Sequence, residues 1–161
     1  MNILQFSDNA EVDRNRFMRA QCLNYIIKGT DAHARNYSII YAPGGAFRLA
    51  PLYDIISDLP YTKKSGSKSS LAMTIGGKRM ISDILPLHWE KQATSVRFSK
   101  DRIFEHLRDL IAILPEAAAL VEKQSINQGL DSPVIPQLRK EIEARCKFLG
   151  RYYGAEKANA A

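Results

Sequence analysis

The sequence predicts a mainly α-helical domain with small β-hairpins. Its 161 residues, 45% hydrophobic and 25% charged, suffice for one hydrophobic core. Apolar residues recur at helical spacing near the start of the chain and again from Pro86 onward. Between these regions, short apolar runs flank glycine-containing turns, as in β-hairpins. We therefore expect one folded unit over residues 13–153, between an irregular N-terminus (1–12) and a frayed tail (154–161).

The first helix is expected at residues 13–28, with Asp13 as its N-terminal cap and Gly29 as its stop. After a loop come two strand candidates, Tyr37–Tyr41 and Ala46–Leu49. The Ala-Pro-Gly-Gly sequence between them is a strong turn signal, so we expect a hairpin.

A second hairpin is expected at Leu71–Ile75 and 78–81, around Gly76 and Gly77. The segment before it, Thr62–Ser70, contains only small, polar and basic residues. Such a segment has no apolar surface to bury, so we expect a mobile, solvated loop.

The remainder of the chain predicts four helices. A stripe of apolar residues marks each of them, and prolines or a capping serine mark most of their starts. The expected ranges are 86–96, 100–114, 115–127 and 133–153.

Charge and targeting features limit the possible environments. The formal net charge of +6 favours polyanionic partners such as nucleotides, nucleic acid or an acidic protein. No apolar run is long enough to span a membrane, and the first 25 residues lack a signal-peptide pattern, so a cytoplasmic protein is expected. Cys22 and Cys146 are expected as buried thiols, and His88 and His106 as structural or exposed residues.

One loop carries a pattern that indicates chemistry. Asp31 and Asn36 show the D-x-x-x-x-N spacing of a kinase catalytic loop, in which the aspartate accepts a proton and the asparagine binds magnesium. Asp54 lies beyond the following hairpin, where a second hard oxygen ligand would be needed. These residues are also common in turns, so a purely structural role is the alternative. The ordered hairpin between them favours a site.

Three segments resemble the carboxyl-terminal part of the HipA-like serine/threonine protein kinases, which are toxins of bacterial toxin–antitoxin pairs. In that family the catalytic loop reads approximately T-D-x-H-x-K-N-x-S, and the metal loop L-x-P-x-Y-D-x-x-S. The likeness runs from about Phe17 to about Tyr153, and it implies a protein-kinase-like C-terminal lobe. The segments are IKGTDAHARNYS (27–38), FRLAPLYDIIS (47–57) and LAM (71–73).

The resemblance implies a role for each matching residue. Asp31 would be the catalytic base and His33 a supporting residue of the catalytic loop, while Asn36 and Asp54 would be the magnesium ligands. Arg35 stands where the family has lysine, so its implied role is phosphate or loop support. The implied cofactor is Mg²⁺, with ATP as substrate and a serine or threonine hydroxyl of a protein as acceptor.

The thirty residues before Asp31 contain one glycine, Gly29, and no strand-borne lysine candidate. Kinases grip the nucleotide with a phosphate-covering loop and such a lysine. We therefore expect a helical lobe without its N-terminal lobe, nearly inactive unless another segment or chain supplies one. The alternatives are a non-catalytic module that binds a helix-turn-helix antitoxin or DNA, and a fragment of a longer chain. Expected partners are that antitoxin, a chain carrying the N-terminal lobe, a protein substrate and, through the antitoxin, DNA; no membrane is expected.

Overall fold

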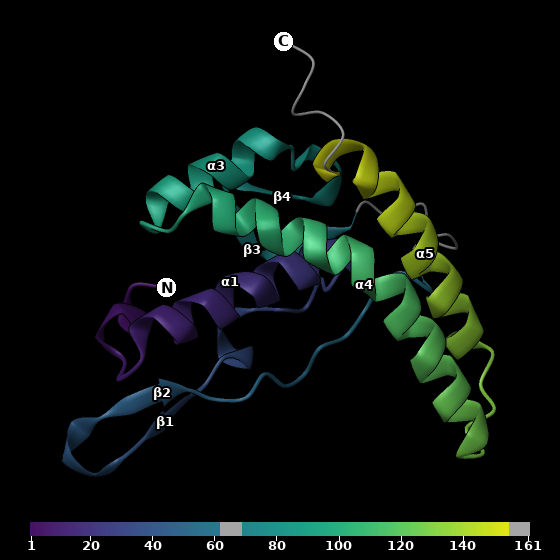
Figure 1. Ribbon diagram of the computed structural model, residues 1–161, viewed down its shortest axis with the longest axis horizontal. Coiled ribbons are helices and arrows are strands. Elements are labelled where there is room, and N and C mark those ends of the chain that lie inside the picture. Colours follow the sequence, from purple (N-terminus) through teal and green to yellow (C-terminus); the bar gives the residue numbers. More distant parts are fainter. Residues whose placement is uncertain (62–68, 155–161) are drawn as a thin grey trace.

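The computed structural model describes residues 1–61 and 69–154 (Figure 1). Four α-helices and two antiparallel hairpins form the fold, so the expected mainly helical class with small hairpins is confirmed. The helices are α1 (Ala10–Ile26), α3 (Pro86–Ser95), α4 (Lys100–Asn127) and α5 (Val134–Tyr153). The strands are β1 (Ile39–Tyr41), β2 (Phe47–Leu49), β3 (Ser70–Ile75) and β4 (Lys78–Met80). Single 3-10 turns lie at η1 (Ile3–Phe6), η2 (Ala34–Asn36), η3 (Pro43–Gly45) and η4 (Ile81–Asp83).

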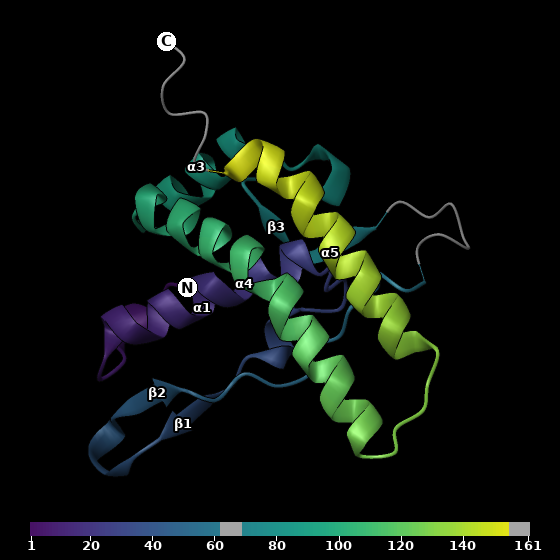
Figure 2. The same cartoon turned by 45° about the vertical axis from the view of Figure 1, so that its right-hand side comes forward.

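The core lies where α1 passes beneath α4 and α5 packs along α4 (Figures 1 and 2). Each helix contributes fully buried side chains, and burial of one large apolar side chain stabilises a fold by about 1.5–3 kcal/mol. The Trp89 ring is completely buried and meets the Tyr25 ring edge-on at 5.5 Å, which makes it a core residue. Other fully buried members of this cluster are Met18, Ile26, Ile75, Ile103 and Leu107.

Helix α4 continues through Pro115, where the sequence predicted a break between two helices. A proline removes one helical hydrogen bond and crowds the preceding turn. The apolar stripe nevertheless continues on both sides of Pro115, and Leu114 and Ala118 pack on the core together with Leu138 of α5. Packing therefore outweighs the local cost, and in the described chain three α-helices follow Pro86 instead of the expected four.

Both predicted hairpins are present. In the first, Ile39 pairs with Leu49 and Tyr41 with Phe47, and the hairpin extends away from the helical body (Figure 1). In the second, β3 pairs with β4 and the turn contains Gly76 and Gly77, both with positive φ. The mobile loop predicted before it, Thr62–Ser70, lies outside the described residues except for its last two positions, and Ser70 already belongs to β3.

The start of the chain differs from the expectation. The 3-10 turn η1 and the first turn of α1 occupy part of the segment predicted to be irregular. Asn9 caps α1, because its side-chain oxygen accepts a hydrogen bond from the Val12 amide at 3.4 Å. Asp13, the predicted cap, lies inside the helix and is fully buried. At the other end, the expected frayed tail after Gly154 lies outside the described residues.

The cysteines and two of the histidines are structural. Cys22 and Cys146 are free, buried thiols, and burial raises the pKa of Cys146 to about 11. The ring of His88 accepts a hydrogen bond from the Leu85 amide at the start of α3. His106 is buried beside Asn15, and burial, followed by the charge of Arg19, lowers the pKa of its ring. Across the described ranges, no helix combines the length and the apolar character that a membrane span requires.

Candidate functional site

A tight turn at the end of α1 leads the chain into the loop predicted to be catalytic. The amide of Gly29 donates to the carbonyl of Asn24 at 2.7 Å. A Cβ atom on Gly29 would collide with the side chain of Asn24, so this close approach requires glycine. The turn places Asp31 five residues beyond Ile26, the last residue of α1.

The loop from Asp31 to Asn36 is folded back on itself. The His33 amide donates to the Asp31 carbonyl at 2.7 Å, and the Asn36 amide donates to the His33 carbonyl at 3.0 Å. The side-chain nitrogen of Asn36 also donates to the Asp31 carbonyl at 3.1 Å. Asn36 is buried, whereas the side chain of Asp31 is 70% exposed. The loop thus holds one polar side chain rigidly and leaves one carboxylate open to solvent.

The second loop brings Asp54 to Asn36. The Asn36 side-chain nitrogen donates to Asp54 Oδ2 at 2.9 Å, which joins residues 18 positions apart in the sequence. Asp54 has a φ of +54°, a left-handed conformation that aspartate tolerates better than most residues. The structure therefore brings together the two residues expected to bind metal.

A tyrosine after β2 connects the same two loops at a second point. The Tyr53 hydroxyl donates to the Arg35 carbonyl at 3.0 Å and lies 2.7 Å from the Ser38 hydroxyl. The Tyr53 side chain is half exposed and acts through its hydroxyl. Its position directly before Asp54 was the available signal for this role.

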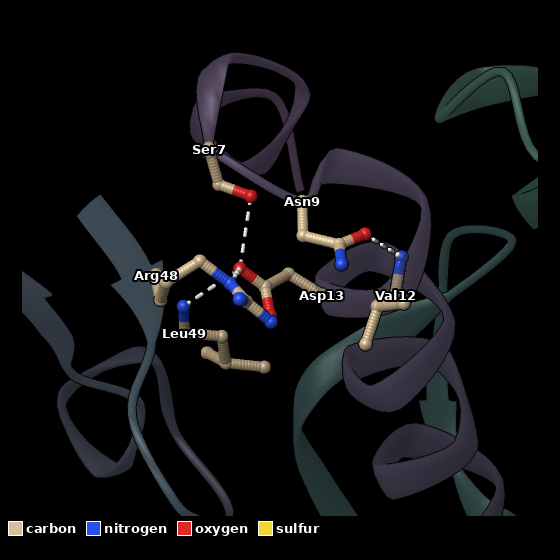
Figure 3. A network of polar contacts seen from close by, with 6 residues as sticks. All are labelled: Ser7, Asn9, Val12, Asp13, Arg48 and Leu49. Carbon is tan, nitrogen blue, oxygen red and sulfur yellow. Dashed lines mark hydrogen bonds and ion pairs between the residues drawn. The ribbon is translucent and has the colours of Figure 1, made fainter. Parts of the chain in front are cut away.

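A buried carboxylate anchors the hairpin that separates the two loops (Figure 3). Asp13 Oδ2 accepts hydrogen bonds from the Ser7 hydroxyl at 2.8 Å, the Leu49 amide at 2.9 Å and Arg48 Nε at 3.1 Å. Burial alone would raise the pKa of Asp13, but these hydrogen bonds, with that of Arg48 the largest, hold it below its usual value. Because Leu49 ends β2, Asp13 fixes the strand from which the chain runs to Asp54.

His33 and Arg35 occupy different surroundings. His33 Nε2 lies 4.0 Å from Asp31 Oδ1, and its other ring nitrogen is buried with no hydrogen-bond partner in residues 1–61 and 69–154. His33 therefore lies beside the expected base. The side chain of Arg35 is exposed, and within the described residues it makes no hydrogen bond or ion pair; only its backbone carbonyl, bonded to Tyr53, joins the site.

The chemistry of the paired side chains fits a hard divalent cation. Both hydrogen bonds of Asn36 use its nitrogen, so its amide oxygen and the Asp54 carboxylate provide oxygen donors of the kind that magnesium prefers. Residues 1–61 and 69–154 contain no group of three or more His, Cys, Asp or Glu side chains suited to a metal ion. Magnesium commonly binds to one or two protein side chains and completes its shell with water and phosphate oxygens. The two side chains, Asn36 and Asp54, are therefore enough protein ligands for a magnesium site of this kind.

Comparison with known proteins finds similarity to a HipA-like domain and to proteins named as putative kinases. Residues 1–118 match the model of the HipA-like C-terminal domain. The chain is 25% identical over 134 residues to "Putative kinase Y4mE" of Sinorhizobium fredii, which covers 83% of the chain and 31% of that protein. It is 36% identical over 59 residues to a "Putative kinase" of Haemophilus influenzae, covering 37% of the chain and 17% of that protein.

A solved structure shares the fold. It is the HipA toxin of Shewanella oneidensis, in complex with HipB and its operator DNA. The TM-score is 0.77 at 19% identity, and the match covers 95% of the chain and 34% of the solved chain. The chain thus spans about a third or less of the length of the proteins that it matches.

Proposed function

The chain belongs to the HipA-like C-terminal domain family, and on that basis we propose that it provides the catalytic base and magnesium ligands of a serine/threonine protein kinase. The proposed reaction is the transfer of the γ-phosphoryl group of ATP to a protein hydroxyl. The observation that supports it most strongly is the 2.9 Å hydrogen bond between Asn36 and Asp54, which unites the expected metal ligands from two separate loops.

Each site residue has a role in this proposal. The exposed carboxylate of Asp31 accepts the proton of the acceptor hydroxyl, and His33 beside it orients that carboxylate. The Asn36 oxygen and the Asp54 carboxylate would hold magnesium, which when bound supplies positive charge to the β- and γ-phosphates. Tyr53 joins the two loops through its hydrogen bond to the Arg35 carbonyl, and Asp13 holds the end of β2 in place through the Leu49 amide.

The nucleotide-gripping part of the reaction is proposed to come from protein outside these residues. The described chain before Asp31 contains no strand, and the cavity bordering Asn36 and Asp54 has a volume of only about 10 Å³. Kinases use a covering loop and a lysine to position the phosphates. Because such electrostatic positioning accounts for much of phosphoryl-transfer catalysis, turnover by these 161 residues alone should be several orders of magnitude below that of a complete kinase.

A second candidate is a binding module that performs no chemistry. The solved structure with the same fold is a complex with HipB and operator DNA, and this chain carries a net charge of +6. Under this alternative, the chain binds a helix-turn-helix antitoxin, or DNA through its phosphates. Such binding would weaken steeply as salt is added, because counterions are released on binding.

Magnesium-dependent binding of ATP separates these two candidates. Calorimetric titration with ATP is performed with and without Mg²⁺ on the wild type, on Asp54→Ala and on the control Asp131→Asn. The control removes a negative charge from an exposed residue between α4 and α5. The kinase proposal expects binding that requires Mg²⁺, is lost in Asp54→Ala and is unchanged in Asp131→Asn.

Two results would contradict the kinase proposal. One is nucleotide binding that is equally strong in Asp54→Ala and in the wild type. The other is the absence of Mg²⁺ binding at Asp54 together with salt-sensitive binding of duplex DNA or of an antitoxin; this result supports the binding module.

A further inference from the structure

A second pocket lies between the last turn of α1, the segment that enters α3 and the C-terminal half of α5. Its volume is about 240 Å³. The walls are mainly aromatic or apolar, and no acidic residue lines it. They include Tyr25 of α1, Leu85, and Arg145, Phe148, Tyr152 and Tyr153 of α5. None of the residues expected to bind metal or accept a proton belongs to it.

Among the described residues, Arg145 is the only charged one that lines this pocket. Its guanidinium carbon lies 5.3 Å from the centre of the Tyr25 ring and 5.7 Å from that of Phe148. Two of its nitrogens, Nε and Nη2, are buried and have no hydrogen-bond partner in the part of the chain that the structure describes. Within the described residues, no carboxylate forms an ion pair with Arg145. Burial lowers the pKa of this group, as expected for a cation held away from water with incomplete compensation.

The charge of Arg145 also acts on Lys28, which two carboxylates accompany. Burial is the main reason that the pKa of Lys28 lies below its usual value, and the charge of Arg145 is the second reason. The two positive side chains are therefore close enough to repel each other, although Asp58 and Glu141 offset part of the effect on Lys28. A negative charge placed beside Arg145 would relieve this repulsion.

We propose that this pocket binds a small aromatic carboxylate. The carboxylate would accept hydrogen bonds from Arg145, and the ring would pack against Tyr152 and Leu85. The Phe148 side chain is 45% exposed, so it can swing outward and give the ligand access to the unpaired guanidinium nitrogens. The proposal does not depend on the proposed kinase function.

Three properties of the pocket select this ligand class. A planar guanidinium matches a carboxylate through two parallel hydrogen bonds. One lining arginine compensates one negative charge, which favours a monoanion over a phosphate dianion. The aromatic walls and the volume of about 240 Å³ suit one ring with a short substituent.

The test uses the complete chain labelled with ¹⁵N, with amide and arginine side-chain NMR signals followed during ligand titration. The probes are benzoate, uncharged benzamide, acetate and inorganic phosphate. We expect benzoate to shift the signals of residues around Arg145. Because a hydrogen bond to a charged group contributes about 1.5–3 kcal/mol, benzamide should bind at least about tenfold more weakly. Acetate and phosphate should also bind more weakly than benzoate.

Two variants locate the site. Arg145→Met should weaken benzoate binding at least about tenfold. Arg151→Met, a control that removes an exposed cation from the same helix, should leave it unchanged. If Arg145→Met does not fold, Arg145→Lys and the comparison of benzoate with benzamide on the wild type decide the result.

The proposal fails if benzoate produces no shifts around Arg145 or if benzamide binds as tightly as benzoate. It also fails if folded Arg145→Met or Arg145→Lys binds benzoate as the wild type does. Acetate binding equal to that of benzoate would exclude an aromatic ligand, and tighter phosphate binding would exclude a monocarboxylate.

Discussion

Asn36 connects the two halves of the candidate site through a single side-chain nitrogen. That nitrogen donates to the backbone of Asp31 and to the carboxylate of Asp54. Both partners depend on chain segments that are themselves fixed, one by the turn at Gly29 and the other by the anchored strand β2. The arrangement of Asn36 and Asp54 is therefore a property of the surrounding hydrogen bonds as much as of these two side chains.

Asp13 is the residue on which that geometry should depend most strongly. In Asp13→Asn, the hydrogen bonds from Arg48, Leu49 and Ser7 lose the negative charge that accepts them. Solvent screens part of the attraction between Asp13 and Arg48, because the Arg48 side chain is 42% exposed. We therefore expect the free energy of unfolding at neutral pH to fall by only about 2 kcal/mol. Urea unfolding measures it, and Asp8→Asn, at an exposed site nearby, is the control.

The difference in stability between the wild type and Asp13→Asn should become smaller as the pH falls. Because the folded-state pKa of Asp13 lies below its ordinary value of 3.8, its contribution is present above pH 3.8. It is lost as the pH falls through the folded-state pKa. The difference between wild type and Asp13→Asn should therefore be constant near neutrality and shrink in acid. A difference that grows in acid, or an equal effect of Asp8→Asn, would contradict this role.

Sequence reasoning predicted the candidate site residues but not the residues that hold them in place. Asp31, Asn36 and Asp54 follow from spacing, because loop chemistry is encoded locally. The role of Asp13 could not be predicted, because its partners Arg48 and Leu49 lie 35 and 36 positions away. A single carboxylate near a helix start has the pattern of a cap, and only the packed fold reveals the longer-range contact.

Elements with a strong local signal agree with the prediction, whereas those decided by packing do not. The hairpin turns are specified by their glycines, and both hairpins are present. The end of a helix at Pro115 was the reasonable local expectation. Contacts between α4 and α5 instead maintain one helix of 28 residues.

The second hairpin gives a test of element packing. Gly76 has a φ of +55°, and a Cβ there would collide with the carbonyl of His88 in α3. Gly77 has a φ of +84°, with nothing within 4 Å of such an atom. Left-handed backbone costs a side chain about 1–2 kcal/mol at either position, and the collision adds to that cost only at Gly76.

We therefore expect Gly76→Ala to lower the thermal unfolding temperature clearly more than Gly77→Ala does. Differential scanning calorimetry of the two variants and the wild type makes the comparison. Equal losses would show that the hairpin does not pack against α3 as described.

At the scale of the whole molecule, the fold is that of a kinase-like C-terminal lobe, as the sequence predicted. Two loops, joined by the hydrogen bond between Asn36 and Asp54, accompany the helical body, and the first hairpin lies between them in the chain. Each match covers about a third or less of the matched protein, so under our proposal the complete reaction involves more protein than these residues. Charge alone could not select among nucleotide, antitoxin and DNA, because all three are polyanionic or carry acidic groups.

The most direct test of the central claim asks whether Asn36 and Asp54 together bind a divalent cation. Mn²⁺, a paramagnetic substitute for Mg²⁺, broadens NMR signals of nearby amides. We predict selective broadening at Asn36 and Asp54 that excess Mg²⁺ reverses, that is absent in Asp54→Ala and that persists in Asp131→Asn. Broadening that is unchanged in Asp54→Ala, or that centres on other residues, would contradict the claim.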